Sequence, residues 1–89
     1  MPQRRLRIVN VKGLHARASA KLVEVVEAHD ASATVARDGI STSGDSIMGL
    51  LMLAAGNGSD IEVETEGPEA EKLMEAIAAL VADRFGEED

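Results

Sequence analysis

The sequence predicts one α+β domain, in which an antiparallel sheet is covered on one face by helices. Apolar and polar residues alternate in several short segments, and apolar residues recur at helical spacing in others. The segments follow the order β-α-β-β-α-β-α. A split βαβ pattern of this type gives one antiparallel sheet with helices packed on one face. The chain of 89 residues is expected to form a single domain over 1–89.

The first half of the chain predicts three strands and one helix. Residues 5–10 alternate and are expected to form a half-buried strand, and residues 16–29 form a helix with one apolar stripe. Residues 33–37 form a strand that leads into Asp38-Gly39, a strong hairpin turn. A short strand over 40–43 completes the hairpin.

The second half predicts a helix, a strand and a last helix. Asp45 or Ser46 caps a helix that runs through Ala55 and stops at the glycines beyond it. Residues 61–66 alternate strictly and form the clearest strand of the chain. Pro68 is expected at the first position of the last helix.

That last helix carries apolar residues at helical spacing from Leu73 onward and extends to Arg84. Residues 86–89 form an acidic tail, which is expected to fray.

The composition limits the possible classes of protein. Cysteine is absent, which excludes disulfides and thiolate metal sites and favours a reducing compartment. The N-terminus lacks the apolar run of a signal peptide, and the longest apolar run is too short to cross a bilayer. Phe85 is the only aromatic residue, so the core is expected to be aliphatic and base stacking on nucleic acid loses support. We therefore expect a cytoplasmic protein that binds neither nucleic acid nor membrane.

Charge is distributed unevenly along the chain. Residues 1–23 hold six basic and no acidic residues, whereas residues 24–89 hold three basic and all sixteen acidic ones. A positive surface in the first part would attract an anionic group or an acidic partner. Arg5 and Arg7 are expected to be structural instead, because adjacent first and last strands would bring them near Glu62 and Glu64.

His15 lies where a turn passes into a helix, in the run Gly13-Leu14-His15-Ala16-Arg17. Good helix formers follow, so His15 is expected at or beside the N-cap. The first helical amides lack partners there, and the macrodipole contributes about half a positive charge. Such an end binds phosphate, and a histidine kept neutral by that field retains a nucleophilic ring nitrogen. With the guanidinium of Arg17, these parts can accept, hold and release a phosphoryl group.

The spacing alone slightly favours a simpler interpretation, because His-x-Arg is common. His15 would then be a polar residue in a surface turn, and Arg17 a solvated helix residue. No metal is expected: His15 and His29 lie fourteen residues apart, and no acidic residue lies near His15 in the sequence. No glycine-rich phosphate loop or acid–base pair of carboxylates is found, so no cofactor is expected.

Two motifs carry a family resemblance. The run from Gly13 to Arg17, followed about thirty residues later by Ser46-Ile47-Met48-Gly49-Leu50, resembles the histidine-containing phosphocarrier (HPr) family of the bacterial phosphotransferase system. The resemblance covers nearly the whole chain. It implies an open-faced sandwich, with three helices on one face of a four-stranded antiparallel sheet. It also implies that His15 takes phosphate from a phosphoenolpyruvate-dependent enzyme I and passes it to an enzyme IIA, as a carrier and not an enzyme.

The sequence also indicates a branch of the family, and it departs from the family's sequence pattern at one position. Residues 50–53 and 61–64 are more similar to the nitrogen-related branch than to the sugar-uptake branch. Family members usually have proline after the arginine, where this chain has Ala18. Alanine suits a helix and restores one N–H near the site, so the backbone of Ala16, Arg17 and Ala18 is expected to bind the phosphoryl group. The departure bears on the rate of transfer more than on the fold.

Ser46 has two compatible roles. As an N-cap its hydroxyl satisfies free backbone donors, typically worth about 1 kcal/mol. The resemblance also implies phosphorylation by a regulatory serine kinase, reversed by a phosphatase, which would add charge that repels acidic partners.

A docking surface is expected beside Ser46 and His15. Ile47 and Met48 form an exposed apolar patch, since exposed methionine suits several partner surfaces, with Leu51 and Lys21 beside it. Enzyme I and the acceptor would both use this surface of a monomeric carrier.

Two other functions remain open. A regulatory phosphoprotein would act by binding alone. A small anion- or RNA-binding module would instead use a basic cluster and lose affinity steeply with salt. The residues of that cluster are Arg4, Arg5, Arg7 and Lys12.

Overall fold

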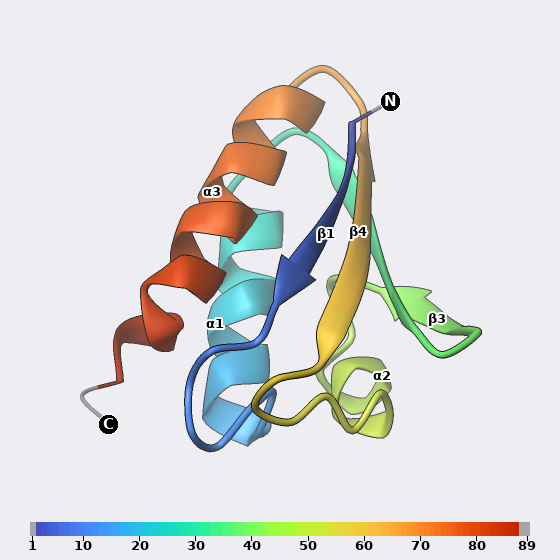
Figure 1. Ribbon diagram of the computed structural model, residues 1–89. Coiled ribbons are helices and arrows are strands. Elements are labelled where there is room, and N and C mark those ends of the chain that lie inside the picture. Colours follow the sequence, from blue (N-terminus) through green and yellow to red (C-terminus); the bar gives the residue numbers. More distant parts are fainter. Residues whose placement is uncertain (1, 88–89) are drawn as a thin grey trace.

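The structure is a computed structural model and describes residues 2–87. Its elements follow the predicted order and form a sheet with helices on one face (Figure 1). The strands are β1 (Gln3–Arg7), β2 (Ser32–Arg37), β3 (Ile40–Ser43) and β4 (Asp60–Glu66). The helices are α1 (Ala16–Glu27), α2 (Ile47–Met52), α3 (Ala70–Ala82) and a final 3-10 turn, η1 (Arg84–Gly86).

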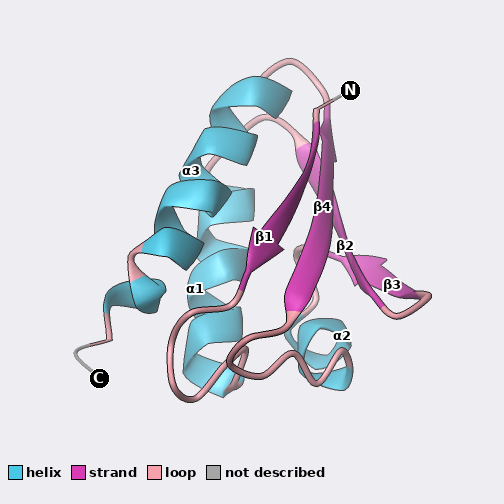
Figure 2. Ribbon diagram, in the orientation of Figure 1, coloured by secondary structure: helices cyan, strands magenta, loops and turns pink. Residues whose placement is uncertain are grey.

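The sheet is antiparallel throughout, with the strand order β1-β4-β2-β3. Residues of β4 alternate between buried and exposed, so Ile61 and Val63 face the helices. Leu6 lies opposite Ile61, and Val35 lies opposite Val63. Figure 2 shows α1 and α3 side by side over the sheet, with α2 beside the first turn of α1. The predicted open-faced sandwich is confirmed.

The core is aliphatic with one aromatic ring, as predicted. Leu22 of α1 and both Leu73 and Ile77 of α3 are fully buried against the sheet. Phe85 is also fully buried, although it lies in the last turn of the described chain. Burial of this large side chain brings the end of the chain back to α1. No helix within residues 2–87 is both long and apolar enough to cross a membrane.

The ends of all three helices differ from prediction. α1 stops at Glu27, and α2 stops at Met52, three residues before the predicted end. Ala54 has a left-handed φ of 52°, which ends α2 and turns the chain toward the loop before His15. Pro68 is not the first helical residue, because α3 begins after the N-cap Glu69.

The C-terminal region also differs from prediction. α3 ends at Ala82, and a residue with left-handed φ, Arg84, separates the buried Phe85 from that helix. The tail expected to fray over 86–89 is ordered at Gly86 and Glu87, because η1 and hydrogen bonds to Glu87 hold it. Residues 88–89 lie outside the described residues.

The strand arginines are paired with acidic residues, as expected, but with partly different ones. Arg5 lies 3.9 Å from Glu62, whereas Arg7 lies 3.1 Å from Asp60. The apolar pattern sets this register, which places Glu64 opposite Gln3.

Candidate functional site

His15 is the N-cap of α1, as the sequence predicts. Its backbone is extended, and no side chain caps the helix. The preceding loop is tight, because Gly13 adopts a left-handed φ of 67° and Leu14 donates from its N–H to the carbonyl of Ala55 at 2.8 Å. Leu14 is buried and anchors the turn, so the imidazole is presented from a fixed backbone.

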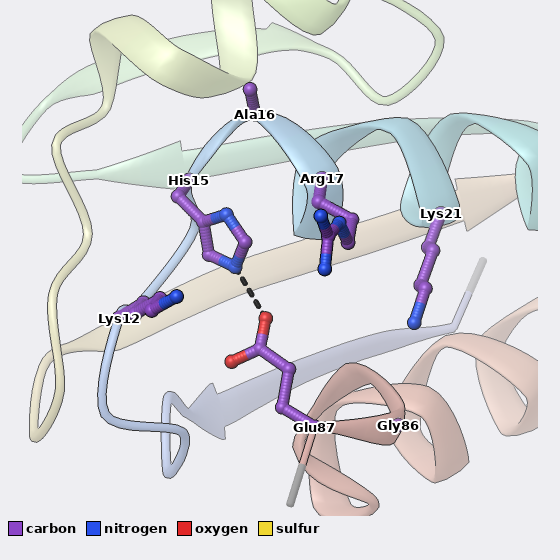
Figure 3. A pocket seen from close by; sticks show the side chains of 7 residues that line it. All are labelled: Lys12, His15, Ala16, Arg17, Lys21, Gly86 and Glu87. Atoms are coloured by element: carbon purple, nitrogen blue, oxygen red, sulfur yellow. Dashed lines mark hydrogen bonds and ion pairs between the residues drawn. The ribbon is translucent and has the colours of Figure 1, made fainter. Parts of the chain in front are cut away.

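A basic pocket surrounds the His15 ring (Figure 3). It combines the start of α1 with the C-terminal turn, two regions far apart in sequence. Its lining residues are Lys12, His15, Ala16, Arg17, Lys21, Gly86 and Glu87. Lys12 therefore lines the His15 pocket. From the sequence it was grouped with the arginines of the first strand, in the basic cluster of the RNA-binding alternative.

Arg17 is the cation best placed to take up an anion. Its side chain is exposed, and within residues 2–87 no acidic group pairs with it. Lys21 is less free, because its ammonium donates to the carbonyl of Phe85 at 2.5 Å. No side chain caps the first backbone amides of α1, which belong to Ala16, Arg17 and Ala18. This end of the helix can therefore bind an anion.

Sequence reasoning missed Glu87, which lies 72 positions from His15. Its Oε2 is hydrogen-bonded to Nε2 of His15, and its Oε1 accepts from Nδ2 of Asn10 at 3.0 Å. The bond from His15, followed by that from Asn10, holds the pKa of the Glu87 carboxyl below its usual value. No local motif signals this contact, since only the burial of Phe85 returns the tail to the site. Among the described residues no cluster suited to a metal ion is found.

The second motif lies beside the first. Ser46 is the N-cap of α2, and its hydroxyl accepts from the N–H of Gly49 at 3.0 Å, which confirms the predicted cap. Met48 is 70% exposed and Ile47 is 40% exposed, while Leu51 is partly buried. The helix α2, which carries these apolar residues, packs against α1 and lies near its start (Figure 1).

A histidine at an open helix end, surrounded by cations, suits a small protein that carries phosphoryl groups. The comparison of sequences agrees with that class. Residues 2–83 match the family described as the PTS HPr component phosphorylation site. The chain belongs to the HPr family, the phosphocarrier proteins of the phosphotransferase system.

Similar proteins carry the names HPr and NPr. The phosphocarrier protein HPr of Cupriavidus necator is 47% identical over 87 residues, and 98% of each chain is covered. The phosphocarrier protein NPr of Shewanella violacea is 39% identical, with 96% of this chain and 93% of that protein covered. The crystal structure of HPr from Bacillus anthracis is 39% identical with a TM-score of 0.86, covering 90% of this chain and 95% of that chain. Such relatives support a phosphocarrier role, and they carry the NPr name as well as the HPr name.

Proposed function

We propose that the chain accepts a phosphoryl group on His15 from enzyme I and passes it to an enzyme IIA-type acceptor. The observation that supports this most is the place of His15 at the uncapped N-terminus of α1, within a pocket that also holds Lys12 and Arg17. The chain supplies an imidazole on a rigid frame, and its partners supply the catalysis.

The pocket can stabilise the charge of the phosphorylated ring. A phosphoryl group brings a charge of about −1.5 to −2 and three strong acceptor oxygens. The amides of Ala16, Arg17 and Ala18 can donate to these oxygens, and the Arg17 guanidinium can donate two parallel hydrogen bonds.

Docking and regulation belong to the same proposal. Enzyme I and the acceptor would both bind over Lys21, Ile47, Met48 and Leu51, because each has to reach one imidazole. A serine kinase and its phosphatase would act on Ser46, at the edge of that surface. The chain would act as a monomer in the cytoplasm.

The decisive test is transfer between purified proteins. Incubation with phosphoenolpyruvate and enzyme I should add one phosphoryl group by intact mass, and mild acid should remove it. His15→Ala should abolish the gain in mass, while the far-ultraviolet circular dichroism spectrum stays unchanged. Acid-labile phosphate on that variant, for example at His29, would overturn the assignment.

An RNA-binding function has less support. Arg4 donates to Glu75 at 2.7 Å, and both Arg5 and Arg7 face acidic partners. These arginines are therefore neutralised along the sheet and do not form a free basic patch. A purely regulatory phosphoprotein would be labelled by enzyme I but would not pass its label to any enzyme IIA.

A further inference from the structure

We infer that Glu87 is a positioning residue for the transfer proposed above: its carboxylate holds the ring proton of His15 on Nε2 and leaves Nδ1 to accept the phosphoryl group. The inference deepens the proposed function and depends on it. It assigns a role to a residue that is 72 positions from His15 in sequence.

The contact itself determines the tautomer. An ionised carboxylate can only accept hydrogen bonds, so a bond between Oε2 of Glu87 and Nε2 of His15 requires the proton on Nε2. The lowered pKa of Glu87 keeps it ionised at neutral pH. In a neutral ring the other nitrogen, Nδ1, then carries a free lone pair. Figure 3 shows Nδ1 on the side of the ring toward the start of α1, where the open amides lie.

Asn10 holds the carboxylate in this orientation. Its amide nitrogen donates both to the carbonyl of Gly13 at 2.8 Å and to Oε1 of Glu87 at 3.0 Å. The opposite orientation of the amide would place its oxygen against two acceptors. Asn10 is fully buried, and its Oδ1 has no partner among the described residues. An unpaired buried oxygen destabilises a fold, which favours a role for Asn10 in orienting Glu87 and the loop.

The transfer step is balanced around this proton. The Nδ1 lone pair forms the new N–P bond while the bond from phosphorus to the donor atom breaks, and that electron pair stays with the donor. The proton remains on Nε2, so the phosphorylated ring is positively charged and paired with the Glu87 carboxylate. In the onward step a nucleophilic atom of the acceptor forms its bond to phosphorus while the N–P bond breaks, and the electrons of the broken bond return to Nδ1, which restores the neutral ring. A ring that keeps its proton is the better leaving group in that step.

Replacement of Glu87 by glutamine gives a sharp test. Asn10 would still donate to Oε1 of the new side chain, so the amide NH₂ would face Nε2 of His15. The ring would then accept at Nε2 and carry its proton on Nδ1, where the lone pair is needed. Ring ¹⁵N NMR at a pH where the imidazole is neutral should show protonated Nε2 in the wild type and protonated Nδ1 in Glu87→Gln. An unchanged tautomer would overturn the inference.

Kinetics supply the second readout. Glu87→Gln should slow phosphoryl acceptance from enzyme I by about tenfold, since a charge-assisted hydrogen bond is lost and the nucleophilic nitrogen is blocked. Glu87→Ala leaves the tautomer of His15 unconstrained. Its rate of phosphoryl acceptance should therefore lie between the rates of Glu87→Gln and the wild type. Glu71→Gln removes the same charge from an exposed position of α3 and should transfer normally. Equal rates for Glu87→Gln and Glu71→Gln, or faster transfer by Glu87→Gln, would contradict the role.

The two proposals fail in different ways. If enzyme I never labels the wild type, the proposed function fails, whichever nitrogen NMR finds protonated. If the wild type is labelled on His15 but Glu87→Gln keeps both its tautomer and its rate, only the role of Glu87 fails.

Discussion

Gly13 lies against the carbonyl of Ala55 so closely that no side chain fits between them. An ideal Cβ on Gly13 would lie 2.5 Å from the Ala55 oxygen, well inside van der Waals contact. The same oxygen accepts a hydrogen bond from the N–H of Leu14. This approach ties the loop that presents His15 to the segment that follows α2.

Gly13→Ala should therefore lower the free energy of unfolding by about 2–4 kcal/mol, from left-handed strain plus a steric clash with backbone atoms. Urea unfolding would measure the change. Gly58 is a matched control, because it has a φ of 87° but open space around its Cβ position. Gly58→Ala should lower the free energy of unfolding by about 1 kcal/mol, from left-handed backbone strain alone. Equal losses for the two variants would show that the Gly13–Ala55 contact does not matter.

Arg17→Lys should slow phosphotransfer by about tenfold while leaving stability within about 0.5 kcal/mol. Lysine keeps the charge but cannot donate two parallel hydrogen bonds to a phosphoryl group. Transfer from labelled enzyme I and thermal unfolding would be measured together. Arg4→Lys alters a guanidinium that is paired with Glu75 away from the pocket, and should transfer normally. A lysine variant as fast as the wild type would reduce Arg17 to a solvated surface residue.

Met48→Glu should weaken binding to both enzyme I and the acceptor by about 2 kcal/mol, because it places a charge at the centre of the proposed apolar patch. The side chain is 70% exposed, so the fold should tolerate the change. Calorimetric titration against each partner would measure the affinity. Ile40→Glu makes the same kind of change at a side chain that is 54% exposed on the β2–β3 hairpin, and should leave both affinities intact. Equal losses from both variants would contradict a local docking surface.

Ser46→Ala should lower the free energy of unfolding by about 1 kcal/mol, since the N–H of Gly49 loses its acceptor. Ser46→Asp keeps an N-cap and should retain most of that stability. It should nevertheless weaken partner binding mildly, because it adds negative charge at the edge of the docking surface. Thermal unfolding and calorimetric titration of both variants would separate the two effects. Stronger binding by Ser46→Asp would contradict the expected repulsion.

The Glu87–His15 contact should be lost in acid. Its hydrogen bonds hold the pKa of the Glu87 carboxyl below the unfolded value of about 4.3. A folded pKa below the unfolded one means that the contact stabilises the fold above the unfolded value, and that this contribution disappears as pH falls through the folded pKa. A ¹³C NMR titration of the Glu87 carboxyl would follow the loss. A midpoint at or above the ordinary glutamate value would contradict the contact.

Elements set by local chemistry were predictable. The hairpin turn at Asp38-Gly39 and the strand that follows it were both predicted at their observed positions. The N-caps were predicted to within a residue, at or beside His15 and at Asp45 or Ser46, and the structure has them at His15 and Ser46. Helix ends were predicted less well. α2 ends at Met52 because the segment after it turns so that Ala55 can accept a hydrogen bond from Leu14, although residues 53–55 have good helix propensity.

The sequence by itself determined the order of the elements, the aliphatic core, and the place of His15 and Arg17 in the first turn of α1. Each depends on residues close together in the chain, whose spacing and propensity act locally. Only the tertiary structure decided that Arg7 pairs with Asp60 and that Glu87 reaches the ring of His15. Strand register and the burial of Phe85 bring those groups together, and both follow from packing over the whole core, which no local pattern specifies.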